Sequence, residues 1–289
     1  MKDYPNSSLK YKEAFKINNG FGTVNDKYNA ICTWSLNGEI EEAINQLESL
    51  AINAKFSNYN HITNDKDLSN LYQHYKWNQI LEIIKKNKEK EDDKLNKPLI
   101  TILDSIYYYD QHYRKQSEAL EKKYGANSKE ITDLWKIINE KDSVNLITIK
   151  NILDTYGWLG TDEIGQQGNA TIFLVIQHSD LETQLKYLPM MREAVKKGNA
   201  KSSSLALLED RIALRQGKSQ IYGSQIGYDK EKNSYYVLPI IDPDNVNIRR
   251  AEVGLPPIET YVNYWQINWN LEQYKKDLPK LKNTLYESK

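Results

Sequence analysis

Apolar residues recur at three- and four-residue intervals through most of this chain, and glycines close many of the segments. In segment 40–51 the recurring residues are Ile40, Ala43, Ile44, Leu47, Leu50 and Ala51. In segment 180–197 they are Leu181, Leu185, Leu188, Met191 and Val195, and Gly198 follows. Because an α-helix turns once every 3.6 residues, this spacing gives each segment one apolar face. The sequence therefore predicts a mainly α-helical fold.

One segment has a different period. Residues 219–241 hold two runs rich in aromatic and β-branched residues around the polar run 229–233, which is typical of a β-hairpin. Pro239 limits strand pairing after it, and Gly223 within the first run suggests a close approach to the backbone. We expect N-terminal helical hairpins and a C-terminal helical domain that carries this one β-hairpin.

Cap residues and glycines predict where the C-terminal helices begin and end. Ser128 and Ser143 could each N-cap a helix. The glycine-rich segment 158–168 has no helical period and is predicted to be a loop. The apolar run 171–178 suits a strand or a helix, and its polar flanks favour a helix. The last helix is expected over 259–277.

The segment 28–51 carries the strongest pattern in the first third of the chain, with two helical stretches around a turn. It resembles a tetratricopeptide repeat through Tyr28, Asn29, Gly38, Glu42 and Ala43. Ile31 departs from that family, which usually has a small residue there. One repeat cannot bury its own apolar face, so the resemblance implies neighbouring helices, which residues 7–18 and 67–84 could supply.

A charged segment separates two predicted domains. Residues 85–97 read KKNKEKEDDKLNK, and Pro98 follows them. Such a run suits a solvated helix end or a linker. We therefore expect a tetratricopeptide-like region over 1–90 and a mostly helical domain over 98–289.

Composition excludes several classes of protein. The 39 basic residues balance 39 acidic ones, which argues against nucleic-acid binding. No run of 18 apolar residues exists, so no membrane span is expected. No apolar stretch follows Met1, so we expect no signal peptide; the chain would be cytoplasmic, or periplasmic or secreted if a signal had been removed. The single cysteine, Cys32, excludes an internal disulfide and is expected to be a small buried residue.

No cofactor-binding motif appears, and the four histidines share no metal-ligand spacing, so neither a cofactor nor a histidine metal site is expected. A carboxylate-rich cation site stays open. Polar clusters in the C-terminal domain are the remaining candidates. His178 ends an apolar run, and an imidazole held by a carboxylate can act as a general acid or base. Alternatively, His178 caps a helix C-terminus. Asp110 and Arg114 share a helix face, as part of a site or as an exposed salt bridge.

The candidate catalytic residues are His178, with Asp180 or Asp210 orienting its ring. The candidate ligand-binding residues are Gln177, Arg211, Tyr222, Gln225, Arg249, Arg250, Asp110 and Arg114.

Arginine use points to the same residues. Only 6 of the 39 basic residues are arginines, and none lies in the first 113 residues. Because the guanidinium group is a planar fork, it is suited to carboxylates, phosphates and aromatic faces where lysine is not. Arg114, Arg211, Arg249 and Arg250 lie within the polar clusters. They are predicted either to hold buried carboxylates, which is a structural role, or to bind an anionic ligand.

The segment 157–261 resembles a bacterial domain family of unknown function. The matching motifs are Gly157-Trp158, Gln177-His178-Ser179-Asp180, Leu208 to Arg211, Gln220 with Tyr222-Gly223-Ser224-Gln225, and Asn247 to Leu255. Two earlier motifs of the family are matched by Asp110-Gln111 with Arg114 and by Asp142 with Asn145. The family implies no activity, although its relatives often look exported.

Two hypotheses follow. In the first, the C-terminal domain is a hydrolase, a transferase or a binder of a small polar or anionic ligand. In the second, the chain is a non-enzymatic protein whose helical-repeat region binds a peptide or a protein partner. The repeat region has scarcely two repeats, too few to make a groove, which weakens the second hypothesis.

Overall fold

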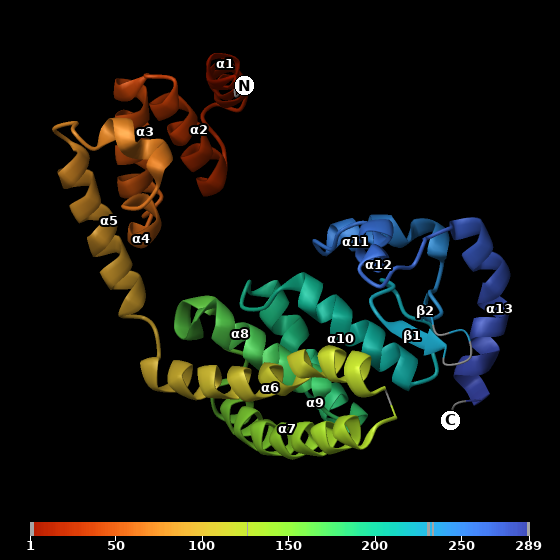
Figure 1. Cartoon of the computed structure of the whole chain (residues 1–289). Coiled ribbons are helices and arrows are strands. Elements are labelled where there is room, and N and C mark those ends of the chain that lie inside the picture. The colour runs from red at the N-terminus through yellow and green to blue at the C-terminus, as the bar shows by residue number, and fades with distance from the viewer. Residues whose placement is uncertain (1–2, 126, 230–231, 233, 288–289) are drawn as a thin grey trace. The chain divides into compact units, whose positions relative to one another are not determined.

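The computed structural model describes residues 3–125, 127–229, 232 and 234–287. The chain divides into two compact units, Met1–Leu95 (unit 1) and Asn96–Lys289 (unit 2). Helices dominate both units, and the described strands form one two-stranded antiparallel sheet, so the predicted fold class is confirmed (Figure 1). Within the described residues, no helix is long and apolar enough to cross a membrane.

Unit 1 is a group of short helices around one apolar core. Its elements are α1 (Tyr4–Ile17), α2 (Val24–Leu36), α3 (Ile40–Asn53), α4 (Tyr59–Ile62), the 3₁₀ helix η1 (Lys66–Leu71) and α5 (Trp77–Asp92). Thr23 and Asp26 form a capping box that starts α2. Gly38, with φ of +80°, makes the turn between α2 and α3 because that backbone conformation is open to glycine. The tetratricopeptide assignment stays a prediction.

The core of unit 1 explains two residues that the sequence singled out. Ile31, at the position where a small residue is usual, has no exposed surface. Cys32 is buried as expected, and burial together with the charge of Asp65 raises the pKa of its thiol to about 12. A thiol that stays protonated is a poor nucleophile, so Cys32 is a core residue.

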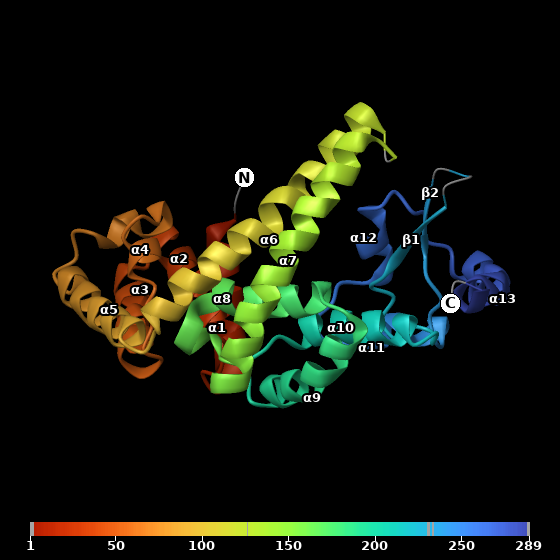
Figure 2. The same ribbon diagram turned by 90° about the horizontal axis from the view of Figure 1, so that it is seen from below.

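Unit 2 contains two long helices, three further helices packed with them, and a small β-containing part. The elements are α6 (Lys97–Tyr124), α7 (Lys129–Tyr156), α8 (Thr161–His178), α9 (Leu181–Lys196), α10 (Ser202–Arg215), β1 (Ile226–Asp229), β2 (Ser234–Val237), the 3₁₀ helix η2 (Pro243–Asn245), α11 (Val246–Glu252), α12 (Ile258–Asn263) and α13 (Leu271–Glu287). Helices α6 and α7 run side by side in both views (Figures 1 and 2). Asn96 and Ser128 N-cap them.

The main core of unit 2 lies among α6, α7 and α8. Leu103, Ile149, Ile172 and Ile176 are fully buried there, and Tyr187 and Leu208 extend the core to α9 and α10. A second, smaller core lies under the hairpin and contains Val237, Ile240, Val246, Ile258, Val262 and Tyr274. The end of α8 therefore lies in the main core, and the segment after the hairpin packs in the second core.

Two predicted helix boundaries are wrong. Ser143 does not cap a helix, because α7 is continuous and the Ser143 hydroxyl donates to the Asn139 carbonyl at 2.8 Å within it. Buried residues continue at helical spacing on both sides of this position, which keeps the helix intact. The glycine-rich segment 158–168 is not all loop, because α8 begins at Thr161 and Gly165, with φ of +70°, interrupts only its first turns.

The β-hairpin is shorter than predicted. Its first strand begins at Ile226, which pairs with Val237, so residues 221–225 are a loop. Residues 230, 231 and 233 of the predicted turn lie outside the described residues. The predicted last helix is two helices, α12 and α13, separated by a segment in which Gln266 has φ of +57°.

Candidate functional site

His178 and Asp110 form a hydrogen-bonded pair between two helices. His178 is the last residue of α8, and its Nδ1 lies 2.9 Å from Oδ1 of Asp110 on α6. The Asp110 side chain is almost fully buried, whereas the imidazole keeps 18% of its surface. Nε2 of His178 has no hydrogen-bond partner among the described residues and is not buried. A neutral imidazole in this setting donates from Nδ1 to the carboxylate and presents the lone pair of Nε2 to solvent.

The apolar stripe of α6 positions Asp110. Leu103 and Ile106 lie seven and four residues before it on the same helix face, and both are buried. Asp110 continues this stripe toward the end of α8, so helix packing carries the carboxylate into the interior. The imidazole that it meets emerges from a helix whose preceding residues Val175 and Ile176 are also core residues.

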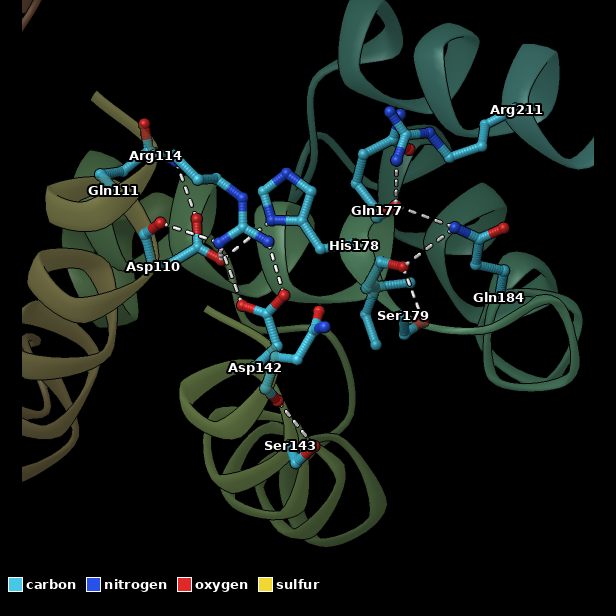
Figure 3. Close-up of polar contacts among 12 residues, drawn as sticks. Asp110, Gln111, Arg114, Asp142, Ser143, Gln177, His178, Ser179, Gln184 and Arg211 are labelled. Carbon is cyan, nitrogen blue, oxygen red and sulfur yellow. Dashed lines mark hydrogen bonds and ion pairs between the residues drawn. The ribbon is translucent and has the colours of Figure 1, made fainter. Parts of the chain in front are cut away.

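Arg114 and Asp142 complete a partly buried ionic network around Asp110 (Figure 3). Arg114 Nη1 lies 3.3 Å from Asp110 Oδ1, and the same guanidinium donates to both oxygens of Asp142 at 3.0 and 2.6 Å. Gln111 donates to the other Asp110 oxygen at 2.8 Å. The Asp110–Arg114 pair is therefore part of a network between α6 and α7, and the alternative of an exposed helix salt bridge is wrong.

The network keeps Asp110 ionised. Burial by itself raises the pKa of this carboxyl, but the hydrogen bond and charge of His178 and the charge of Arg114 outweigh burial, so the pKa lies below its ordinary value. An ionised Asp110 accepts from Nδ1 of His178 and holds the imidazole in one orientation.

A cavity opens beside the imidazole. It has a volume of about 310 Å³ and is lined by Asn139, Asp142, Ser143, Leu146, Val175, His178, Ser179 and Asp180. The lining combines two apolar side chains with amide, hydroxyl and carboxylate groups. Such a mixture suits a small polar molecule, which the apolar atoms would contact and the polar atoms would orient.

The prediction that Asp180 or Asp210 orients the imidazole is wrong. Asp180 is exposed and N-caps α9, where it accepts from the Thr183 backbone N–H at 2.7 Å. Asp210 is fully buried and faces the loop after α10. Among the described residues, the carboxylate on the His178 ring is that of Asp110, which the sequence had placed only among ligand-binding residues.

Asp210 instead holds the loop 220–225. Its oxygens accept from the backbone N–H groups of Ile221, Tyr222 and Ser224 at 2.6, 2.9 and 2.9 Å. Burial raises the pKa of the Asp210 carboxyl even though these donors favour the charged form. Gly223 has φ of +70°, and a Cβ there would lie 2.8 Å from both Ile240 and Ile258. The close approach predicted at Gly223 is thus one of protein packing.

Arg249 and Arg250 brace the same loop from α11. Arg249 donates to the Ile221 carbonyl at 3.0 Å and pairs with Asp242 at 3.2 Å. Arg250 donates to the Tyr222 and Pro256 carbonyls at 2.7 and 2.6 Å. Its guanidinium also lies 4.9 Å from the centre of the Tyr261 ring. These contacts favour the structural role that the sequence left open for both arginines.

The sequence-predicted residues therefore divide into two groups. Asp110, Arg114 and His178 meet at the end of α8, and Arg211 joins them because it donates to the Gln177 carbonyl at 3.0 Å (Figure 3). Asp210, Tyr222, Arg249 and Arg250 lie around the loop 220–225. Gln225 bridges the groups, since its Oε1 accepts from Arg211 at 3.2 Å. The Gln177 side chain is buried and points to the Leu207 carbonyl.

Sequence reasoning did not select two residues of this region for the site. Asp142 was noted only within the family resemblance, and Arg215 was not among the candidate residues. Arg215 donates to the Ser179 carbonyl at 2.6 Å. Its position four residues after Arg211 on the same helix was the signal that could have identified it. Among the described residues, no group of three or more histidine, cysteine or acidic side chains is arranged to hold a metal ion.

Comparison with known proteins assigns unit 2 to a protein family. No curated protein and no solved structure matches the chain. A family model does match: it covers residues 105–273, which is more than half of the chain and extends from within α6 to the first residues of α13. The matched span contains the His178–Asp110 pair, its ionic network and the loop around Asp210. The chain belongs to this family, which is described as a family of unknown function (DUF6624).

Proposed function

We propose that unit 2 is a hydrolase or group-transferase domain that acts on a small polar or anionic ligand, with His178 as the general acid or base. The observation that carries this proposal is the geometry of the imidazole. Its Nδ1 is tied to a buried carboxylate, while its Nε2 is open to solvent and its ring lines a cavity of about 310 Å³.

Each residue of the network has a separate task in this proposal. Nε2 of His178 takes a proton from an attacking water or hydroxyl group and returns it to the leaving group. Asp110 fixes the orientation of the ring and stabilises its charge after protonation. Arg114 is a positioning residue, because it keeps Asp110 ionised and ties α6 to Asp142 on α7.

The cavity lining supplies the contacts to the ligand. Asn139, Ser143 and Asp180 offer hydrogen-bonding groups on the wall that His178 also lines. Leu146 and Val175 supply apolar surface between them. Their arrangement supports a ligand of a few polar groups rather than an extended polymer.

The test is a screen of small polar and anionic molecules by thermal shift, followed by turnover assays on each hit. We expect His178→Gln to lower turnover of a substrate by about 10²- to 10⁴-fold, because a positioned general acid or base contributes that much. His112→Ala is the matched control, since the ring contacts and hydrogen bond of this exposed histidine among the described residues are with neighbours on α6. Equal turnover by wild type and His178→Gln would contradict the proposal.

A further inference from the structure

Two arginines of α10 contact the backbone on either side of His178. Arg211 donates to the carbonyl of Gln177, the residue before it, at 3.0 Å. Arg215 donates to the carbonyl of Ser179, the residue after it, at 2.6 Å. Because the two arginines lie four residues apart, both project from one face of α10 toward the end of α8.

Neither arginine has a carboxylate partner among the described residues. Three of the other arginines pair with carboxylates: Arg114 with Asp110 and Asp142, Arg192 with Glu209, and Arg249 with Asp242. Arg250 donates to two carbonyls from Nε and Nη1 and lies over the Tyr261 ring, while its Nη2 is buried without a hydrogen-bond partner. Among the described residues, Arg211, Arg215 and Arg250 therefore lack a carboxylate partner, and of these three Arg211 and Arg215 contact the end of α8.

The contacts with the end of α8 use only part of the hydrogen-bonding capacity of Arg211 and Arg215. They use one terminal nitrogen of each guanidinium, and a lysine could make the same contact. Nη2 of Arg211, and Nε and Nη2 of Arg215, have no partner among the described residues. Nη2 of Arg211 is not buried, and Arg215 is an exposed residue. Open donors from two guanidinium groups therefore remain beside His178.

Burial and neighbouring positive charges disfavour the charged form of Arg211. Burial, together with the nearby charges of Arg215 and Arg114, lowers the pKa of its guanidinium to about 10. A half-buried cation among like charges costs free energy, and a bound oxyanion would offset that cost. Planar N–H forks are also the donor geometry that best matches the oxygens of a phosphate or carboxylate.

We propose that Arg211 and Arg215 form an oxyanion site beside His178, which holds the phosphate or carboxylate group of the ligand. This inference rests on the proposed function in taking His178 as the group that acts on the bound molecule. It narrows the proposed ligands from small polar or anionic molecules to anionic ones. The oxyanion would be anchored by α10, while the imidazole on α8 faces the part of the ligand that reacts.

The test is calorimetric titration of the whole chain with inorganic phosphate and, separately, with malonate. Sodium chloride replaces each anion at equal ionic strength, up to about 50 mM, so that general screening is held constant. Tighter binding of phosphate would assign the site to phosphoryl groups, and tighter binding of malonate to carboxylates. Binding of either anion supports the proposal, whereas binding of neither overturns it.

Variants locate the binding. We expect the double variant Arg211→Gln with Arg215→Gln to weaken anion affinity at least about tenfold, because two charge-assisted hydrogen-bond donors are lost. Arg192→Gln is the matched control, since it removes an exposed arginine that pairs with Glu209. Affinity unchanged in the double variant would overturn the proposal and leave the two arginines as helix caps.

Two further variants distinguish misfolding of the double glutamine variant, failure of the oxyanion site and failure of the proposed function. Arg211→Lys with Arg215→Lys keeps a positive charge at each position, so it serves where the double glutamine variant does not fold. Loss of the fork geometry should still weaken binding in this variant, and full affinity would overturn the proposal. His178→Gln should retain phosphate binding, because the imidazole is not an anchor. Anion binding without His178-dependent turnover would contradict the proposed function but leave the oxyanion site standing.

Discussion

Asp210 is a buried carboxylate that is held by peptide groups rather than by a cation. Its two oxygens accept from three backbone N–H groups of the loop that follows α10. The same loop is tied by Gln220, whose side chain bonds to the backbone of Gln225 and Leu238. Charged and amide side chains in this region therefore organise a segment without regular secondary structure, since each satisfies peptide groups that no sheet or helix pairs.

Replacing Asp210 tests this role. We expect Asp210→Ala to lower the free energy of unfolding by about 2–4 kcal/mol, because it leaves buried N–H donors without an acceptor. Urea unfolding followed by circular dichroism would measure the loss. Glu209→Ala is the control, since this neighbour pairs with the exposed Arg192 and should change stability little. Equal effects of the two variants would contradict the role.

The pKa of Asp110 predicts how stability depends on pH. Because the pKa in the folded state lies below the ordinary value of 3.8, the ionised carboxylate stabilises the fold at pH values above that figure. This contribution is lost as the pH falls through the folded-state pKa. Asp110→Asn should therefore cost about 2 kcal/mol near neutral pH, and the difference from wild type should shrink below about pH 4.

Chemical unfolding at a series of pH values would check that curve. Asp104→Asn is the matched control, since Asp104 lies on the exposed face of α6 and accepts from Gln167. Its difference from wild type should stay small throughout. A cost of Asp110→Asn that is independent of pH would show that the carboxylate is not ionised in the fold.

At the scale of elements, the end of α8 organises the site. Helix α6 brings Asp110 and Arg114 to it, α7 brings Asp142, and α10 brings Arg211 and Arg215. The continuity of α7 matters here, because a helix break at Ser143 would move Asp142 relative to Arg114. Three helices that share one core thus place charges from distant segments within hydrogen-bonding distance.

Two serines of α7 test its boundaries. Ser128 Oγ accepts from the Ile131 N–H at 3.3 Å and caps the helix, so Ser128→Ala should lower stability by about 1 kcal/mol. Ser143 donates to a carbonyl within the helix, so Ser143→Ala should be close to neutral. Urea unfolding would compare them. A larger loss for Ser143→Ala would indicate that a second helix begins there.

At the scale of the whole molecule, each unit has its own core. Ile31, Trp34, Leu47 and Ile80 belong to the core of unit 1, whereas the buried residues of α6 to α10 form the main core of unit 2. The division falls between Leu95 and Asn96, and Asn96 N-caps α6 within unit 2. A unit with its own buried core can fold without the other.

Separate expression of residues 1–95 and 96–289 tests that independence. We expect each fragment to unfold cooperatively in urea, because the chain is cut where one core ends and the next begins. The fragment 96–289 should also retain any anion binding of the whole chain, since every residue of the proposed oxyanion site lies within it. A fragment 96–289 without a cooperative transition would contradict the division.

Local patterns in the sequence predicted much of the fold and less of the site. The helical spacing of apolar residues, which can be read from a short segment alone, correctly indicated α3 and α9, and the two helical stretches predicted within 28–51 are α2 and α3. A predicted helix boundary was wrong where tertiary packing overrode a local capping signal, as at Ser143. His178 was correctly placed at a helix end. Its partner was not predicted, because Asp110 lies 68 residues away and only helix packing brings it close.

The sequence by itself determined the helical character, the position of the hairpin, and the rarity of arginine in a lysine-rich chain. These features are properties of residue type and spacing, so they need no knowledge of long-range contacts. The tertiary structure decided which arginines are already paired, which carboxylate orients His178, and that Asp210 holds a loop. Those outcomes depend on distances between groups far apart in the chain, and packing of the buried helix faces sets those distances.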